Sequence, residues 1–94
     1  MKPLSQEQIQ EHLKEFSNWS FEDNAIHISL EFEDFKNAFT AMTRMAFEAE
    51  KHEHHPNWSN TYNTVNISLS THDADGVTEK DFKLAKAFED VLGQ

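Results

Sequence analysis

The hydrophobic period of the chain changes at Asp34, and this change constrains the fold more than any other feature. Over residues 26–32 every second residue is apolar, which is typical of a β-strand with one buried face. Over residues 35–51 apolar residues recur at every third or fourth position, which is the pattern of an amphipathic helix. Because aspartate is a favoured N-cap, the sequence predicts a strand that leads directly into a helix. The apolar face of this predicted helix consists of Phe35, Ala38, Phe39, Met42, Met45, Ala46 and Ala49.

The same two periods place the remaining elements. A capping box and an apolar stripe predict a first helix over about residues 5–15, and alternation over residues 19–32 around the turn sequence E-D-N predicts a β-hairpin. Alternation over residues 61–71 predicts a further strand, and a second capping box opens a last helix over residues 78–92. The predicted order of helix, two strands, helix, strand and helix indicates an α+β fold, in which helices pack on one face of a small antiparallel sheet.

Length, cysteine content and charge narrow the class of protein. With 94 residues we expect one domain over residues 1–94, since the chain is too short for two hydrophobic cores. The absence of cysteine excludes disulfides, thiolate nucleophiles and sulfur-ligated zinc, and a net charge of −9 opposes direct binding to nucleic acid. The N-terminus lacks the apolar stretch of a signal peptide and no run reaches membrane-spanning length, so we expect a cytoplasmic protein with no membrane partner. Open sheet edges favour self-association.

The stretch E-A-E-K-H-E-H-H-P-N-W, residues 48–58, is the main candidate for a functional site because it holds three of the six histidines. Three interpretations are open on spacing alone. In the first, Glu50 and His54 bind a metal from one helix face, which requires the helix to continue to residue 54, although no cysteine-based or H-E-x-x-H zinc motif is present. In the second, the histidines end a helix, where positive side chains interact favourably with the helix dipole.

The third interpretation is acid/base chemistry. Two imidazoles with ordinary pKa values of about 6.5 can serve as acid and base at neutral pH. A carboxylate such as Glu50 can fix a tautomer or accept from a substrate N–H, and an aromatic residue such as Trp58 can flank a flat heterocycle. His72 can approach the cluster only through the fold. Trp58, His72 and Asp81 each also have a purely structural explanation, as a core residue, a strand end and part of a capping box.

The run over residues 48–72, followed by G-V-T-E-K-D at residues 76–81, resembles the pterin-4a-carbinolamine dehydratases. The pattern of that family is a glutamate four residues before H-H-P, an aromatic residue two after the proline, and then Y-N-x-V-x-I-x-L-x-T-H. The predicted element order also agrees with this family along nearly the whole chain. The chain matches the pattern at Glu50, His54, His55, Pro56, Trp58, Tyr62, Asn63, Val65, Ile67, Leu69, Thr71 and His72.

The resemblance implies dehydration of 4a-hydroxytetrahydropterin to quinonoid dihydropterin and water, with no metal and no cofactor besides the pterin substrate. This step recycles the pterin after an aromatic amino-acid hydroxylase has turned over, so a functional link to such an enzyme is implied, as is a homodimer or homotetramer. Some animal members also serve as dimerisation cofactors of a homeodomain transcription factor. A non-catalytic dimerisation or coactivator role is therefore the alternative function.

The resemblance also implies which residues form the site. The three histidines of the family's binding cleft map onto His54, His55 and His72. We expect His55 and His72 to act as the acid/base pair, and His54 to bind and orient the pterin.

Four further residues complete the predicted site. Glu50 would hydrogen-bond the substrate or hold a histidine in place, and Trp58 would shape the cleft wall. Asp81 would support the site while capping its helix, and Thr71 would bind the substrate.

Overall fold

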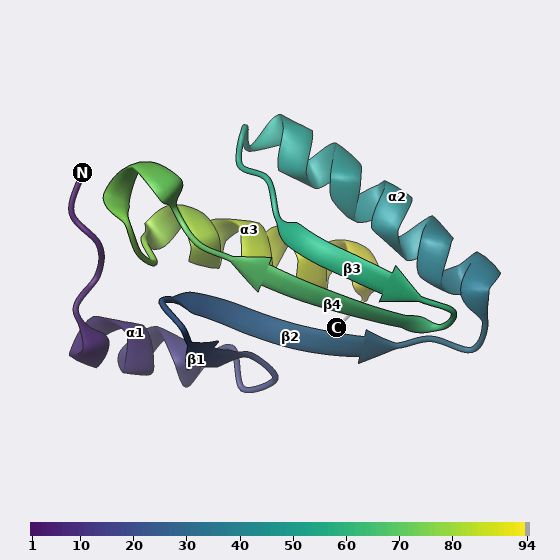
Figure 1. Cartoon of the computed structure of the whole chain (residues 1–94), viewed down its shortest axis with the longest axis horizontal. Helices are drawn as coiled ribbons and strands as arrows, with labels where there is room; N and C mark the ends of the chain where they lie inside the picture. Colours follow the sequence, from purple (N-terminus) through teal and green to yellow (C-terminus); the bar gives the residue numbers. More distant parts are fainter. Residues whose placement is uncertain (94) are drawn as a thin grey trace.

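Three α-helices and a four-stranded antiparallel sheet make up the structure, a computed structural model that describes residues 1–93 (Figure 1). In chain order the elements are α1 (Gln6–Leu13), β1 (Ser20–Glu22), β2 (Ala25–Glu31), α2 (Phe35–Lys51), β3 (Asn57–Thr61), β4 (Thr64–Leu69), the 3₁₀ helix η1 (His72–Ala74) and α3 (Glu79–Leu92). The strands lie in the order β1-β2-β4-β3. The α+β class predicted from the sequence is confirmed. Within the described residues, no helix is long and apolar enough to cross a lipid bilayer.

The structure contains one strand that the sequence analysis does not predict. A single strand is predicted over residues 61–71, whereas the chain forms a hairpin of β3 and β4 around Tyr62 and Asn63. Tyr62 adopts a left-handed backbone conformation with φ of 49°, and the carbonyl oxygen of Asn63 accepts from the N–H of Phe32 at 2.8 Å. The segment N-W-S-N-T that forms β3 has only one large apolar residue, so its hydrophobic period does not reveal it. The order is therefore helix, two strands, helix, two strands and helix.

The sheet has one face toward the helices and one polar face. In Figure 1, α2 and α3 lie on one side of the sheet and α1 lies beside β1. The strand register aligns Trp58 with Ile67 and Ile67 with Ile28 in one row across three strands, which is the row on the helix side. The two adjacent rows consist of serine and asparagine side chains and His27, and they face away from the helices. The alternation read from the sequence thus reflects a sheet that is covered on one face only.

The core lies between the sheet and the two longer helices, and α2 departs from its predicted apolar face. Ala38, Met45 and Ala49 are buried as predicted, whereas the side chains of Phe35 and Phe39 are 49% and 58% exposed. Phe35 is the first residue of α2, and Phe39 lies about 100° around the helix from Ala38. Both phenylalanines therefore fall outside the stripe that meets the sheet. The largest fully buried side chains are Phe88, Ile26, Met45, Ile67, Leu69, Leu84, Val65, Val77 and Asp81.

Candidate active site

A Schellman motif ends α2 and sets the direction of the histidine cluster. The N–H of Glu53 donates to the carbonyl of Glu50 at 3.1 Å, and the N–H of His54 donates to that of Ala49 at 3.1 Å. Glu53 takes the left-handed conformation that this motif requires, with φ of 51°. The helix stops at Lys51, so the helical pairing of Glu50 with His54 that a metal site would need does not form.

His54 pairs instead with Asp81, in the first turn of α3. Its Nε2 lies 2.5 Å from Oδ1 of Asp81, and the two side chains are 12% and 0% exposed. An ionised carboxylate can only accept hydrogen bonds, so the imidazole Nε2–H is the donor. Because this pair is mostly shielded from water, the bond restrains the orientation of the ring.

The second oxygen of Asp81 belongs to the cap of α3. Its Oδ2 accepts from the backbone N–H of Thr78 at 2.9 Å and from the hydroxyl of Thr71 at 2.9 Å. The two threonine hydroxyls lie 2.6 Å apart, and both residues are buried. The predicted capping box is confirmed. The structural and functional explanations of Asp81 are therefore compatible, since one oxygen serves the helix and the other serves His54.

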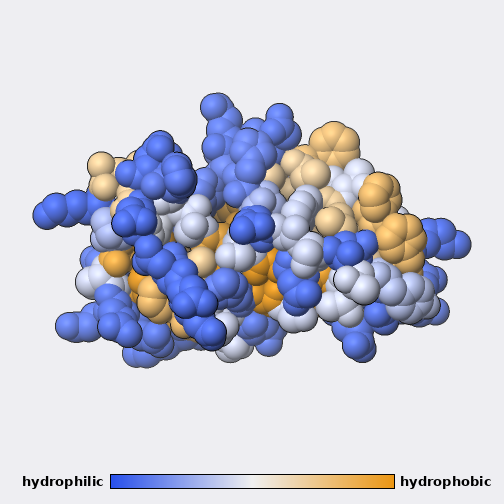
Figure 2. Space-filling view, in the orientation of Figure 1, coloured by the Kyte–Doolittle hydropathy of each residue, from blue (hydrophilic) through white to orange (hydrophobic). Residues whose placement is uncertain are grey.

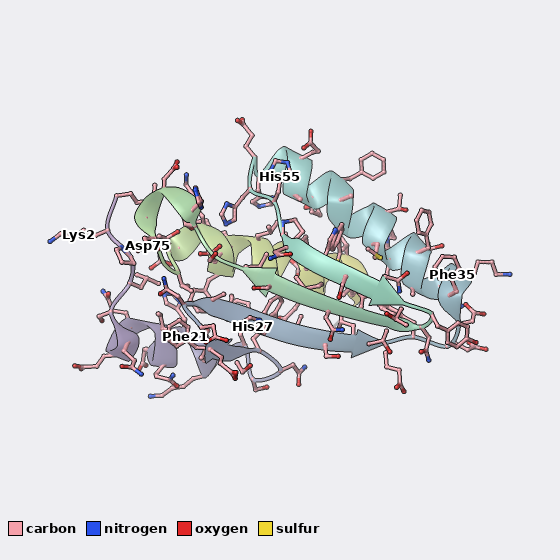
Figure 3. All side chains as sticks on the ribbon, in the orientation of Figure 1. Lys2, Phe21, His27, Phe35, His55 and Asp75 are labelled. Carbon is pink, nitrogen blue, oxygen red and sulfur yellow. The ribbon has the colours of Figure 1, made fainter. Side chains whose placement is uncertain are left out.

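His55 forms a second histidine–carboxylate pair, with Glu50. Its Nε2 lies 2.5 Å from Oε2 of Glu50, but here the side chains are 62% and 77% exposed. Figure 3 shows His55 just beyond the end of α2. Glu50 is expected either to bind the substrate or to hold a histidine, and in the structure it contacts a histidine. Exposed pairs of this kind contribute only about 0–1 kcal/mol, because water competes for both groups.

His72 lies beyond the end of β4 and opens η1. The loop is closed by Thr71, whose N–H donates to the carbonyl of Gly76 at 2.8 Å and whose carbonyl accepts from Ala74 at 3.1 Å. Asp75 completes the turn in a left-handed conformation, with φ of 53°. The sequence predicts His72 at the strand end, and the structure places it three residues beyond Leu69, the last residue of β4, where His72 is exposed.

These segments enclose a small cleft of about 230 Å³. It brings together all three predicted histidines, which come from the end of α2 and from η1. Glu50 and Asp81 do not line the cleft themselves and reach it through His55 and His54. The residues that line it are Glu53, His54, His55, Ser70, Thr71, His72, Asp73 and Lys80.

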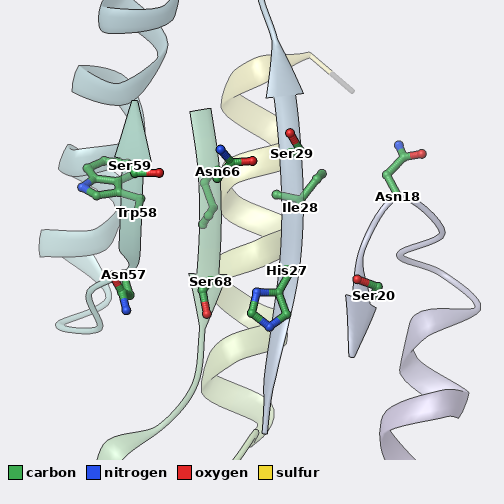
Figure 4. A pocket seen from close by; sticks show the side chains of 11 residues that line it. Asn18, Ser20, His27, Ile28, Ser29, Asn57, Trp58, Ser59, Asn66 and Ser68 are labelled. Atoms are coloured by element: carbon green, nitrogen blue, oxygen red, sulfur yellow. The ribbon is translucent and has the colours of Figure 1, made fainter. Parts of the chain in front are cut away.

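Trp58 is not brought to this cleft. It pairs with Ile67 on the helix side of the sheet and packs against the core while remaining partly exposed. It borders a different hollow of about 520 Å³ on the sheet, together with serine and asparagine side chains of β3 and β4 (Figure 4). Its role as a wall of the pterin cleft stays a prediction.

The metal interpretation has no support in the geometry of the described residues. Within residues 1–93, no three histidine, aspartate or glutamate side chains are grouped so that they could hold a metal ion. The carboxylates of Glu50 and Asp81 are already engaged, each with an imidazole. Imidazole and carboxylate groups of this kind can donate, accept and exchange protons.

Known proteins resemble this chain along nearly its whole length. The model of the family described as pterin 4 alpha carbinolamine dehydratase matches residues 2–91. The chain belongs to this family. It is 62% identical over 92 residues to a putative pterin-4-alpha-carbinolamine dehydratase of Christiangramia forsetii, covering 98% of this chain and 95% of that one. A protein of the same name from Chloroflexus aggregans is 45% identical and covers 99% of this chain and 100% of its own length.

A solved structure shows the same fold. The crystal structure of a transcriptional coactivator/pterin dehydratase from Brucella melitensis superposes with a TM-score of 0.92 at 39% identity, covering 96% of this chain and 98% of that one. The resemblance to the pterin carbinolamine dehydratases stated from the sequence is therefore confirmed, as is the element order once β3 is added.

Four of the residues that line the cleft are not predicted from the sequence. They are Glu53, Ser70, Asp73 and Lys80. Each is the direct chain neighbour of a predicted site residue, and this adjacency is their one indication in the sequence. Lys80 lies in the first turn of α3 beside Asp81, and it is the cationic residue of the cleft wall.

Proposed function

We propose that this chain is a dehydratase that converts 4a-hydroxytetrahydropterin to quinonoid dihydropterin and water. The observation that carries the proposal is the cleft in which His54, His55 and His72 meet, in a chain of the pterin carbinolamine dehydratase family. The named relatives support the same activity, since a dehydratase of this kind is a lyase acting on a pterin.

The reaction requires two proton transfers and no electron transfer to another molecule. The bond between C4a and its hydroxyl oxygen breaks, and the oxygen leaves as water after it receives a proton. The N5–H proton goes to a base, and its electron pair forms the double bond between N5 and C4a. Imidazoles suit both transfers at neutral pH, and each transfer is worth roughly 10²–10⁴-fold in rate. Such a step regenerates the pterin used by an aromatic amino-acid hydroxylase, which is the functional link we propose.

We assign the acid and base roles to His55 and His72. His55 has its Nε2 held by Glu50, which leaves Nδ1 for the substrate. His72 is exposed at the cleft, and its ring has no hydrogen-bond partner among residues 1–93, so it is available to exchange a proton with the substrate.

His54 differs from the other two and is assigned to binding. Its ring is held by the fully buried Asp81, and a ring held in this way positions a flat substrate better than it shuttles protons. In this assignment Glu50 and Asp81 act on the substrate through the histidines that they hold, and Lys80 lies at the cleft wall beside them.

The test of the proposed function is the decay of freshly generated 4a-hydroxytetrahydropterin, followed by stopped-flow ultraviolet absorbance in the presence of a chelator. We expect the protein to accelerate the decay, and the chelator to leave the acceleration unchanged. A correctly folded sample that leaves the spontaneous rate unaltered would refute the dehydratase assignment. Acceleration that disappears with chelator would refute the metal-free mechanism.

We also propose that the exposed face of α2 mediates assembly into a homodimer or homotetramer. Phe35, Phe39 and Phe47 are 49%, 58% and 70% exposed, and Figure 2 shows apolar side chains gathered over this helix. Size-exclusion chromatography with light scattering should therefore give at least a dimer for the chain and a smaller species for Phe39→Asp. A monomer before substitution would contradict the proposal.

A coactivator role is the alternative function that the same face favours. The Brucella relative is named both a transcriptional coactivator and a pterin dehydratase, and an apolar helix face is a surface on which a partner helix can dock. If the stopped-flow test shows no dehydration, a binding role through α2 becomes the preferred assignment.

A further inference from the structure

We propose that Thr71 and Thr78 are positioning residues of the site, which act through Asp81 to hold His54 with its proton on Nε2. The tautomer of His54 is a property of the substrate-free protein, and only the effect on kcat/KM rests on the proposed function. It follows from the direction in which each hydrogen bond at the start of α3 must run.

The direction of this chain of hydrogen bonds is fixed by proton counting. The hydroxyl of Thr71 has one proton, and it donates that proton to Oδ2 of Asp81 at 2.9 Å. The hydroxyl of Thr78 must then be the donor in its 2.6 Å contact with Thr71. The oxygen of Thr78 in turn accepts from the backbone N–H of Lys80 at 3.2 Å. The chain therefore begins at the backbone of α3 and ends on Asp81.

Asp81 is left with one oxygen for His54. Its Oδ2 is filled by the Thr71 hydroxyl and the Thr78 N–H, and its Oδ1 lies 2.5 Å from Nε2 of His54. Every donor in this cluster points toward the carboxylate, so nothing at this end of the ring can supply a proton to a bare Nε2. The neutral imidazole therefore carries its proton on Nε2, and Nδ1 carries the lone pair.

The lone pair on Nδ1 is accessible. Residues 1–93 offer no hydrogen-bond partner for this nitrogen, and none of their buried side-chain nitrogens or oxygens lacks a partner. Nδ1 is therefore not buried, on a histidine that lines the cleft. Such an atom accepts from an N–H of a bound heterocycle and disfavours a carbonyl at the same place, so the threonine chain selects which edge of a pterin faces His54.

This inference changes the part that Thr71 plays. The sequence predicts that Thr71 contacts the substrate, but its side chain is buried and its hydroxyl proton is committed to Asp81. Thr78 enters the sequence analysis as a helix cap alone. Both residues are placed here as supports of His54, and Thr71, which borders the cleft, acts on the substrate through Asp81 rather than directly through its own hydroxyl.

The direct test is the tautomer of His54 in the substrate-free protein, read from ¹⁵N chemical shifts of the imidazole nitrogens and assigned with His54→Gln. We expect a protonated Nε2 and a bare Nδ1 at a pH where the ring is neutral. A proton on Nδ1 would overturn the proposal. This readout does not depend on catalysis, so it separates failure of the inference from failure of the dehydratase assignment.

Matched variants test the chain itself. Thr71→Val removes one of the two donors to Oδ2 and leaves the Asp81 carboxylate free to turn away from His54. Where the bond from His54 Nε2 to Oδ1 is lost the tautomer is no longer fixed, so we expect mixed tautomers at His54 and about a tenfold loss of kcat/KM, the order expected for one hydrogen bond to a charged group. Thr78→Val should have a smaller effect in the same direction, because Thr71 keeps its bond to Asp81. Thr71→Ser and Thr78→Ser keep the hydroxyls, so the His54 tautomer and kcat/KM should stay those of the unaltered protein.

Thr40→Val is the control for the loss of a threonine hydroxyl elsewhere. Thr40 is exposed on α2 and its hydroxyl donates to the carbonyl of Lys36 at 2.8 Å, so neither readout should change. If Thr71→Val keeps a single Nε2–H tautomer and normal kcat/KM, the proposal is overturned. If that variant does not fold, the tautomer of the unaltered protein still decides.

Discussion

The pairs His54–Asp81 and His55–Glu50 both join an imidazole Nε2 to a carboxylate oxygen at 2.5 Å, yet their surroundings are opposite. The side chains of the first pair are 12% and 0% exposed, and those of the second are 62% and 77% exposed. Asp81 has further partners in two threonines, whereas Glu50 extends from the last turn of α2 into solvent. Equal distances therefore do not mean equal constraints.

The difference indicates how neighbouring histidines can take different roles. Water competes for both groups of an exposed pair, so the contact with Glu50 restrains the His55 ring only weakly. A buried pair lacks that competition, so His54 keeps one orientation and one tautomer. In the proposed assignment, His55 transfers protons because it faces solvent, and its sequence neighbour His54 binds the substrate because it faces α3.

The largest effect should come from removing the acid/base histidines. For His55→Ala and His72→Ala we expect the dehydration rate to fall by roughly 10²–10⁴-fold, while the free energy of unfolding changes by less than about 0.5 kcal/mol. Stopped-flow absorbance and urea denaturation measure the two quantities. His52→Ala is the control, because His52 lies at the same helix end outside the cleft. Full activity in either of the first two variants would remove that residue from the assignment.

Asp81→Ala and Glu50→Ala should separate the two pairs by stability. Loss of Asp81 leaves the buried hydroxyl of Thr71 and the N–H of Thr78 without their acceptor, so we expect the free energy of unfolding to fall by about 2–3 kcal/mol. Loss of Glu50 exposes only groups that water already reaches, and we expect a change below about 0.5 kcal/mol. Equal losses in urea denaturation would mean that burial does not distinguish the pairs.

Salt should distinguish the two histidine–carboxylate pairs through its effect on their coupling energies, which is smaller than the effects above. In a double-mutant cycle of His55→Ala and Glu50→Ala, we expect a coupling energy of at most about 1 kcal/mol that decreases in salt of about 1 M. The corresponding cycle of His54→Ala and Asp81→Ala should give a larger coupling energy. Salt should change it little, because the surrounding protein keeps dissolved ions away from the pair. A salt-sensitive coupling between His54 and Asp81 would contradict their burial.

The smallest effect concerns a third carboxylate, that of Asp34, which caps α2. The backbone N–H and side chain of Asn37 donate to it and lower the pKa of Asp34 below its ordinary value of 3.8. A lowered pKa stabilises the fold above the unfolded-state value, and this contribution is lost as the pH falls through the folded-state value. The stability difference between the unaltered protein and Asp34→Ala should therefore be full at about pH 6 and shrink below about pH 4. A stability difference that grows on acidification would mean that the pKa of Asp34 is raised by folding rather than lowered.

The sequence predicts most of the fold because periodicity and caps are local properties. The capping boxes at Ser5 and Thr78 both occupy their predicted places. The strand β3 escapes prediction because only one of its large side chains is apolar, and because a turn at Tyr62 and Asn63 carries no glycine.

The site is predictable only in part. A local sequence motif identifies its histidines, but which carboxylate each histidine contacts depends on the tertiary structure. The family motif names His54, His55 and His72, and the structure gathers them in one cleft. Spacing suggests that Glu50 meets His54, but the Schellman motif turns the chain so that Glu50 meets His55. The contact of His54 with Asp81 spans 27 residues of sequence and depends on how α3 packs beside the end of α2.

The most direct test of the contrast between the pairs is a comparison of kcat/KM for Asp81→Asn and Glu50→Gln. In Asp81→Asn the new amide keeps an oxygen acceptor for Thr71 and Thr78 while presenting its N–H to His54, which forces the opposite tautomer without opening a cavity. We predict a loss of about tenfold or more for Asp81→Asn and of less than about threefold for Glu50→Gln, because only the buried partner fixes its ring. Equal losses, or a larger loss for Glu50→Gln, would contradict the claim that burial assigns the two histidines their different roles.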